Sequence, residues 1–437
     1  MLLEFRTKNF KSFQEELVFS MTPAPKQKGL DYSLLRKKIG VKEYKALSSA
    51  VIYGPNAAGK TNIIAAMDVL KQVMLRGHIR NADQKSRSNP SASALELIPG
   101  KADQHKSPVD FAIRFIENGL LFDYKLSLDL GSFLNEDYER KVLTEILSIN
   151  EKMIFSRSPS LEIGDTKLIQ NYLINGFEEN EASAKHLAKN NLIPDELFLM
   201  NGFKAMFSSK LVNIIMDWLE DKFMVFCRAD ALQARPSSSK KDTLYINTTV
   251  NDAARLFGIN SNALGYFSSE EDSEPKLYSL LDKQEIVQAD TFESFGTIRF
   301  VNMFPIVIDA LLSGGTLVID EFDASLHPMA IMSIINIFHN DDLNKNNAQL
   351  IFNTHNPIFL NSNLFRRDEI KFVERDAETF CSSHYALSDF GTSGEKAVRM
   401  GGDYMKNYFV SQYGAIKDVD FTPVIEKLLE TKGGKHK

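Results

Sequence analysis

Cysteine and tryptophan are scarce in this chain of 437 residues, which has two cysteines and one tryptophan. The two cysteines, Cys227 and Cys381, form no CxxC pair and no disulfide framework, so a disulfide-stabilised secreted fold is excluded and a reducing, cytoplasmic environment is expected. No run of about 18 apolar residues is present, so we expect no membrane-spanning helix and no membrane partner. The first apolar run is broken at Glu4, and we expect no signal peptide.

Acidic and basic side chains are nearly balanced. The chain has 51 lysines and arginines against 57 aspartates and glutamates, a formal net charge of −6, which excludes a uniformly basic, histone-like nucleic-acid binder. Apolar residues make up 43% and charged residues 25%, values typical of folded globular chains. The length exceeds one minimal domain and fits one large α/β domain with insertions, or two to three modules.

Two kinds of periodicity alternate along the chain. Alternating apolar residues predict antiparallel strands in the first 160 residues, with a polar, lysine-rich loop expected between about residues 23 and 45. Helical spacing dominates from about residue 166 to 226, and short strands that are apolar on both faces, typical of a parallel sheet, return after residue 285. We therefore expect an α/β fold in three stretches: residues 1–160, a mainly helical insertion at 161–285, and residues 286–437.

A glycine-rich turn follows the apolar strand at residues 50–53 and precedes a helix with apolar residues at three-to-four spacing. Its sequence matches the pattern G-x-x-x-x-G-K-[ST] in full: Gly54, Pro55, Asn56, Ala57, Ala58, Gly59, Lys60 and Thr61. Glycines let successive backbone N–H groups point at phosphate oxygens, and the positive N-terminal end of the helix adds to the attraction. We expect Lys60 to reach the β- and γ-phosphates of ATP, and the Thr61 hydroxyl to bind Mg²⁺.

Two carboxylates end the apolar strand at residues 316–319. A carboxylate at the carboxyl end of a central strand lies where α/β sheets bind their ligands. We expect Asp320 to hold Mg²⁺, directly or through water, and Glu321 to orient and deprotonate the attacking water. Asp323 follows closely. His355 ends the next apolar strand, where it is either a contact to the γ-phosphate or an ordinary surface histidine.

These motifs together resemble the ABC-type ATPase head shared by the SMC, RecF and OLD families. Residues 320–323 resemble a Walker B motif with its catalytic glutamate and the start of a D-loop, and His355 resembles the switch histidine. Residues 293–297, E-S-F-G-T, resemble the signature motif, and residues 9–13, N-F-K-S-F, resemble the opening of such heads. The chain is most similar to compact bacterial ATPases often called the AAA-fifteen type, found in abortive-infection and other anti-phage systems.

The resemblance implies a fold, ligands and partners. The fold would be a P-loop NTPase with an ABC-ATPase-like head, consisting of a mixed central sheet, an antiparallel β lobe and a helical insertion. Ser294 and Gly296 would contact the γ-phosphate of a nucleotide held by a second subunit, and Asp323, at the start of the D-loop, would help to bind the nucleotide. ATP would then drive formation of a homodimer or higher homo-oligomer, and hydrolysis would reverse it.

Three functions stay open on these grounds. One is an ATPase that controls a separate effector, a toxin or a nuclease, in anti-phage defence. Another is a RecF-like ATPase that binds duplex DNA in repair or recombination; the basic stretch from Arg76 to Arg87 is then a DNA track, and otherwise a solvated loop. The third is a nucleotide-dependent scaffold with negligible turnover. An intrinsic nuclease is not expected, because no D-x-D pair follows Glu374.

Overall fold

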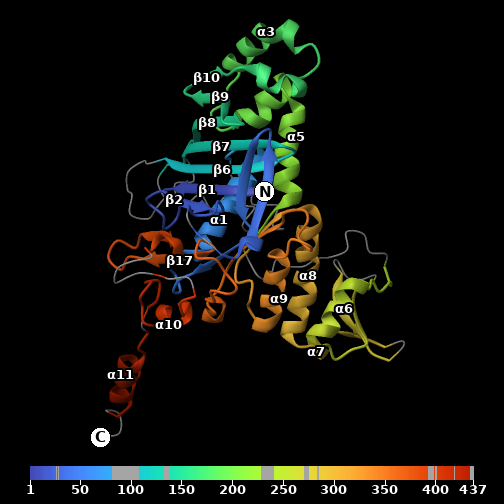
Figure 1. The fold of residues 1–437 in the computed structure, drawn as a ribbon, viewed down its shortest axis with the longest axis vertical. Coiled ribbons are helices and arrows are strands. Elements are labelled where there is room, and N and C mark those ends of the chain that lie inside the picture. Colours follow the sequence, from blue (N-terminus) through green and yellow to red (C-terminus); the bar gives the residue numbers. More distant parts are fainter. Residues whose placement is uncertain are drawn as a thin grey trace.

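The computed structural model describes residues 1–25, 27, 29–80, 108–131, 138–227, 241–269, 275–282, 285–391, 398, 401–417 and 419–433. Within this part of the chain, two large sheets lie one above the other along the long axis of the molecule (Figure 1). An antiparallel lobe and a helical region form the upper half of the view, and a central sheet with its helices forms the lower half.

Six strands form the central sheet, in the order β11-β15-β16-β5-β17-β18. The first five run parallel, and β18 is an antiparallel edge strand, so the predicted mixed sheet is confirmed. The strands are β5 (Ser49–Tyr53), β11 (Phe223–Phe226), β15 (Thr316–Ile319), β16 (Gln349–Asn353), β17 (Ile370–Arg375) and β18 (Ser382–Ala386). β5, β15 and β16 are buried along their whole length, because both faces of the sheet are covered.

Helices cover the two faces of this sheet: α1 (Lys60–Arg76) on one side, and α8 (Phe295–Ser313) and α9 (Pro328–Phe338) on the other. Successive side chains of β5 point to opposite faces. Ala50 and Ile52 therefore lie in one hydrophobic core with α1 and the antiparallel lobe, and Val51 and Tyr53 lie in a second core with α8 and α9.

Seven antiparallel strands form the β lobe, in the order β10-β9-β8-β7-β6-β1-β2. They are β1 (Leu2–Lys8), β2 (Leu17–Ser20), β6 (Val109–Glu117), β7 (Leu120–Asp129), β8 (Lys141–Ile149), β9 (Lys152–Ser158) and β10 (Ser160–Ile163). The expectation of a loop from 23 to 45 is wrong for its second half, which contains the hairpin of β3 (Leu34–Ile39) and β4 (Lys42–Leu47). Leu35 and Ala46 of this hairpin are buried against Met1 and Leu3, and this burial stabilises strands despite the surrounding lysines.

A helical region packs on the β lobe. It consists of α3 (Phe177–Asn190), α4 (Lys204–Met206) and α5 (Ser209–Asp217). Trp218, directly after α5, is 1% exposed, and its ring stacks on Phe115 of β6 with centroids 3.8 Å apart. The division into three stretches stays a prediction, but β11, within the middle stretch, is an edge strand of the central sheet.

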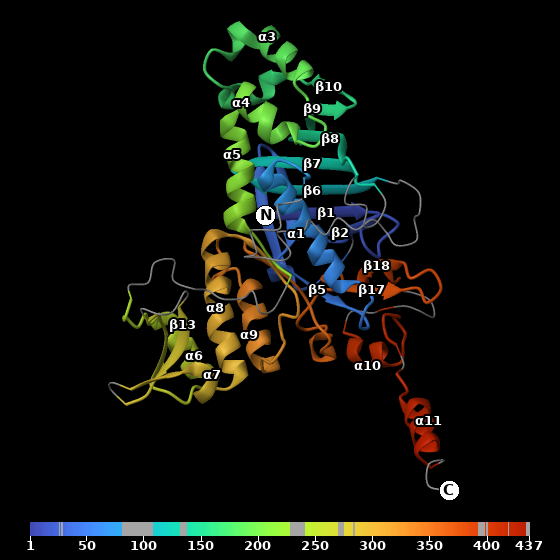
Figure 2. The ribbon, with the colours of Figure 1, turned by 180° about the vertical axis from the view of Figure 1, so that it is seen from behind.

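A small three-stranded sheet lies beside α8, on the side of the molecule away from the C-terminal helices (Figure 2). Its elements are α6 (Thr248–Phe257), β12 (Ala263–Phe267), β13 (Lys276–Leu280), β14 (Ile286–Gln288) and α7 (Ala289–Phe292). We call the described residues between 241 and 292 the small-sheet unit. Phe257 stacks on Phe300 of α8, with ring centroids 4.7 Å apart and planes within 3° of parallel, so the unit is packed directly against this helix.

We expected no segment long and apolar enough to span a membrane, and one described helix contradicts this, by its length and composition alone. Among the described residues, α8 has 19 residues and an 18-residue window of mean hydropathy 1.5. The physical reason is its place in the fold: 44% of that window is buried between the central sheet and the small-sheet unit. Core helices of large α/β domains are this apolar because several layers cover them.

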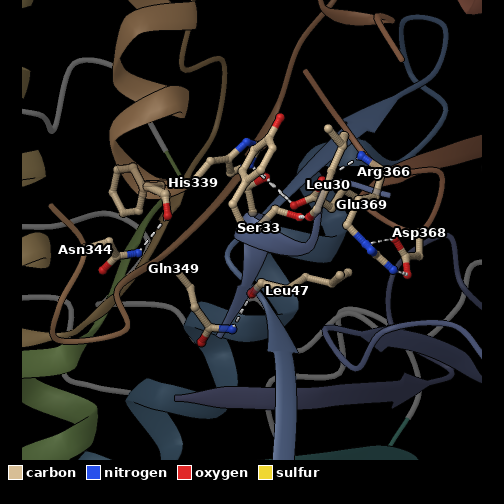
Figure 3. A network of polar contacts seen from close by, with 12 residues as sticks. Leu30, Ser33, Leu47, His339, Asn344, Gln349, Arg366, Asp368 and Glu369 are labelled. Carbon is tan, nitrogen blue, oxygen red and sulfur yellow. Dashed lines mark hydrogen bonds and ion pairs between the residues drawn. The ribbon is translucent and has the colours of Figure 1, made fainter. Parts of the chain in front are cut away.

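A buried polar network ties together the ends of the central strands that face away from the phosphate loop (Figure 3). The Ser49 hydroxyl donates to Glu369 Oε1 at 3.0 Å and lies 2.8 Å from His339 Nε2. The Gln349 amide donates to the backbone carbonyls of Leu2 and Leu47, each at 3.0 Å. Because these groups satisfy buried backbone and side-chain atoms at the amino ends of the strands, we assign them a structural role.

The C-terminal region contains α10 (Tyr404–Phe409) and α11 (Thr422–Gly433). Tyr408 and Tyr413 pack on Phe372 of β17, with ring centroids 6.0 and 5.7 Å away. α11 extends away from the rest of the chain in both views (Figures 1 and 2).

Candidate nucleotide site

The phosphate loop joins β5 to α1 and uses its glycines in two ways. Gly59 has a φ of 111°, and a Cβ there would lie 2.7 Å from Ser382 Oγ and 2.8 Å from Ser12 Oγ. At Gly54, a Cβ would overlap the Val373 carbonyl oxygen of the neighbouring strand β17. The loop is therefore both left-handed at its end and tightly packed against its neighbours, which only glycine permits.

Two serines from distant parts of the sequence hydrogen-bond to each other next to the phosphate loop. Ser382 of β18 donates to the Ala58 carbonyl oxygen at 2.5 Å and lies 2.7 Å from Ser12 Oγ. Ser12 in turn accepts a hydrogen bond from Asn62 of α1 at 2.8 Å. The N-F-K-S-F segment thus fastens the first turn of α1 to the C-terminal half of the chain.

Lys60 lies at the centre of the site. Its ammonium group donates to the carbonyl oxygens of Gly54 and Pro55 at 2.9 and 3.1 Å, and the side chain is buried. Burial lowers the pKa of Lys60 to about 8, against the opposing attraction of Asp320 and Glu321. A buried ammonium group held mainly by backbone carbonyl oxygens can exchange them for phosphate oxygens at little cost in free energy, because it stays hydrogen-bonded.

Thr61, Asp320 and Asn353 form the part of the site that fits a metal ion. The Thr61 hydroxyl lies 3.1 Å from each carboxylate oxygen of Asp320, and the Asn353 amide donates to the same carboxylate. Burial raises the pKa of Asp320, and the hydrogen bonds from Asn353 and Thr61 oppose that rise. A hydroxyl and a carboxylate are the oxygen ligands that Mg²⁺ takes beside nucleotide phosphates, so these residues fit the predicted ion.

Glu321 is held by its backbone. Its N–H donates to Asn353 Oδ1 at 2.6 Å, and its carbonyl oxygen accepts a hydrogen bond from Arg299 at 2.6 Å. The residue has a φ of 50°, in the left-handed region, and its side chain is exposed at the carboxyl end of β15. A constrained backbone in such a conformation is typical of functional sites, and it directs the carboxylate away from the core.

Asp323 and His355 complete the edge formed by β15 and β16. Thr354 donates to Asp323 at 2.7 Å, and burial raises the pKa of that carboxyl group. Burial lowers the pKa of His355, and the nearby Lys60 ammonium adds to the effect, so the imidazole is neutral at pH 7. The structure therefore brings the residues predicted for phosphate, metal and water to the carboxyl ends of three adjacent strands.

The signature residues lie at the start of α8. Ser294 caps the helix, its hydroxyl accepting from the Thr297 N–H at 3.1 Å. A Cβ on Gly296 would lie 2.6 Å from the Ser325 carbonyl oxygen, so the signature rests against the segment after Asp323 of its own chain. Ser294 and Phe295 are exposed, Phe295 to 70%, and their action on a second subunit stays a prediction.

Four residues of the site escaped sequence reasoning: Arg299, Asn353, Thr354 and Ser382. Asn353 and Thr354 directly precede His355 at the end of an apolar strand, and this position beside Asp320 was the available signal. No local pattern marks Arg299, which lies inside the apolar helix α8, or Ser382, which starts an edge strand.

The basic stretch after α1 is described only up to Arg80; residues 81–107 lie outside the described part of the chain. Arg80 pairs with Asp195 at 3.2 Å and Glu196 at 2.6 Å, which neutralises part of this surface.

Glu374 accepts a hydrogen bond from the backbone of Ala415 and so anchors the C-terminal segment. Among the described residues, no group of three or more His, Cys, Asp or Glu side chains is arranged to hold a metal.

A family model described as "AAA domain, putative AbiEii toxin, Type IV TA system" matches residues 49–210 and 227–361, which together make up most of the chain. The chain belongs to this AAA family. The matched residues include the phosphate loop, the signature and the carboxylates of β15. With the arrangement of the central sheet and its site, this AAA protein has an ABC-type P-loop ATPase head, as expected from its motifs.

Solved SMC heads are similar to this AAA protein over most of its length, with low scores. A structure entitled "SMC head domain from Thermotoga maritima" has 12% identity and a TM-score of 0.34, covering 88% of this chain and 98% of that one. An SmcHead bound to the C-winged helix domain of ScpA has 12% identity and a TM-score of 0.38, covering 88% and 97%. A Pyrococcus furiosus Smc head has 11% identity and a TM-score of 0.37, covering 88% and 96%. The comparison with curated proteins found no match.

Proposed function

We propose that this AAA protein binds and hydrolyses ATP with Mg²⁺ and acts as a nucleotide-driven oligomeric switch. The observation that carries the proposal is the juxtaposition of Lys60, the Thr61–Asp320 pair and Glu321 at one edge of the central sheet. A carboxylate that is only a surface group would not be buried against the hydroxyl of a phosphate loop, as Asp320 is.

In this proposal the two ends of the nucleotide lie on opposite sides of β5. The catalytic carboxylates end β15 and His355 follows β16, on one side of the phosphate loop, so the γ-phosphate belongs there. On the other side, a cavity of about 930 Å³ extends over β17 and β18 and includes the loop residues 55–58. Arg375 covers the Phe380 ring in this cavity, 5.3 Å from its centroid, and such flat surfaces favour stacking of a nucleobase.

Each side chain then has a defined task. Lys60 would neutralise the β- and γ-phosphates, while Thr61 and Asp320 would hold Mg²⁺, which when bound draws charge from the phosphates. Glu321 would orient the attacking water and accept its proton. His355, neutral at pH 7 because burial and Lys60 lower its pKa, would donate a hydrogen bond to the γ-phosphate.

The oligomeric part of the proposal rests on the signature. Ser294 and Phe295 are exposed at the N-terminal end of α8, where the partial positive charge of the helix favours an anion. In a symmetric dimer this end would close over the γ-phosphate of the other subunit, giving two composite sites. A homodimer or a higher homo-oligomer would form with ATP and separate after hydrolysis.

The biological role that we propose is control of a separate effector, such as a toxin or nuclease, in anti-phage defence. The family's description, which names a toxin of a toxin–antitoxin system, supports such a setting.

The test is a mass measurement of the Glu321→Gln protein with and without ATP, together with ATP turnover of the wild type. We expect Glu321→Gln to abolish turnover and to hold the dimer or larger oligomer when ATP is present. Turnover that survives Glu321→Gln unchanged contradicts the catalytic assignment, and a monomer under both conditions contradicts the trans site. Salt-dependent binding of duplex DNA only with ATP would favour the RecF-like alternative.

A further inference from the structure

We propose that Glu293 is a positioning residue that fixes the signature serine, Ser294, through the small-sheet unit and thereby sets the hydrolysis rate at the partner's nucleotide. The inference rests on the proposed function, in which Ser294 acts on a second subunit.

The Glu293 carboxylate is held by three hydrogen bonds from the small-sheet unit. The side chain is buried, at 8% exposure, although the next two residues are exposed. It accepts hydrogen bonds from the Ser261 hydroxyl at 2.5 Å, the Asn260 backbone N–H at 3.0 Å and the Ser279 hydroxyl at 3.3 Å. A buried carboxylate with three donors is confined to one orientation, and its charge is stabilised by them.

A second contact holds the other side of the signature to the same unit. The Thr297 hydroxyl, three residues after Ser294, donates to the Gly258 carbonyl oxygen at 3.2 Å. Glu293 and Thr297 therefore flank Ser294 and are both tied to the connection between α6 and β12, at residues 258–261. With Gly296 packed on the Ser325 carbonyl oxygen, contacts of three neighbouring residues together fix the position of the serine.

A positioning role differs from a merely structural one in which property a substitution changes: the hydrolysis rate or nucleotide binding. Loosening Glu293 leaves Lys60 and Thr61 of the same chain in place, because their side chains bond to Gly54, Pro55 and Asp320 and, within the described part of the chain, not to the signature. A displacement of about 1 Å in a group that positions a reacting phosphate costs on the order of 100-fold in rate. We therefore expect the rate to fall while nucleotide affinity is retained.

The experiment compares Glu293→Ala, Glu293→Gln and Ser261→Ala with Glu285→Gln, an exposed glutamate of the same unit. We expect kcat to fall roughly 10- to 100-fold for Glu293→Ala and less for the other two, which keep part of the network. Affinity for a fluorescent ATP analogue should stay within about twofold of wild type, and the Glu285→Gln control should match the wild type in both measurements. If Glu293→Ala does not fold, Glu293→Gln and Ser261→Ala carry the test.

Mixing Glu293→Ala with Lys60→Ala protein separates a role in trans from a role in cis. A mixed dimer has one site in which the phosphate loop comes from the Glu293→Ala chain and the signature from the Lys60→Ala chain, both intact. We expect the mixture to turn over ATP faster than the sum of the two proteins alone; no gain overturns the inference. Absent ATP turnover in the wild type refutes the proposed function itself, whereas a Glu293→Ala protein with wild-type kcat refutes only this inference.

Discussion

Asn353 hydrogen-bonds to the Asp320 carboxylate and to the Glu321 backbone, and replacing it with alanine tests the site more directly than replacing either acidic residue. Its Nδ2 donates to the Asp320 carboxylate, and its Oδ1 accepts the Glu321 N–H at 2.6 Å. The side chain is 1% exposed, so water does not readily replace it. Asn353→Ala therefore loosens both residues and leaves both carboxylates present.

The magnitude follows from the two hydrogen bonds. A hydrogen bond to a charged group contributes about 1.5–3 kcal/mol, and a neutral one about 1 kcal/mol. The Glu321 backbone, with its φ of 50°, also loses one of the hydrogen bonds that hold its conformation. If about 1.4–3 kcal/mol of this sum is expressed in the transition state, kcat falls roughly 10- to 100-fold, since each 1.36 kcal/mol is about tenfold in rate.

The assay is steady-state ATP hydrolysis over a range of Mg²⁺ concentrations, with Asn356→Ala as the matched control. Asn356 lies three residues further on and caps a short turn through Ile358 N–H at 3.1 Å, so its loss should leave kcat within about twofold of wild type. For Asn353→Ala we expect lower kcat, weaker apparent Mg²⁺ affinity and nearly unchanged ATP affinity, because the contacts of Lys60 are untouched. A folded Asn353→Ala protein with wild-type kcat would refute the assignment.

Three other substitutions test the phosphate loop, the core of the β lobe and a buried histidine. Gly59→Ala should abolish binding of a fluorescent ATP analogue, because a Cβ would lie 2.7 Å from Ser382 Oγ in a loop with a φ of 111°. Trp218→Phe should cost less than about 1.5 kcal/mol in urea unfolding, because the buried indole N–H has no partner in the described structure, whereas Trp218→Ala should cost about 3–5 kcal/mol. Burial, with the Lys371 ammonium, lowers the pKa of His384 to about 3; the unfolded chain takes up the proton near pH 6.5, so stability falls as the pH drops. His384→Gln should remove up to about 2 kcal/mol of the loss between pH 7 and pH 5, and an unchanged pH dependence would contradict this.

The parts of the site that could be predicted are those in which neighbouring residues act together. The phosphate loop is one short segment, and its glycines, Lys60 and Thr61 act at fixed spacing between a strand and a helix. The sequence pattern alone therefore predicts how these residues are arranged around a phosphate. The same holds for Asp320 and Glu321 at the end of β15, because parallel strands end at a common edge. β15, β16 and β5 are buried on both faces, and their apolar runs predicted a parallel sheet.

The parts that escaped prediction are contacts between distant segments. Ser12 and Ser382 are 370 positions apart and meet at 2.7 Å under the phosphate loop. The hairpin of β3 and β4 is lysine-rich, and it is ordered because one side packs on Met1 and Leu3. In each case a tertiary contact, absent from any local window, decides the conformation.

The small-sheet unit shows why length alone could not reveal the architecture. In the sequence, the stretch between the helical region and the signature reads as an insertion of no defined purpose. In the structure, its residues 258–261 supply contacts that hold both sides of Ser294, and Phe257 stacks on the helix that Ser294 caps. Because the small-sheet unit holds the residues on both sides of Ser294, it cannot move without moving the signature. Under the proposed function, a partner that displaced this unit would therefore alter hydrolysis on the opposite subunit, while nucleotide binding by its own chain stayed intact.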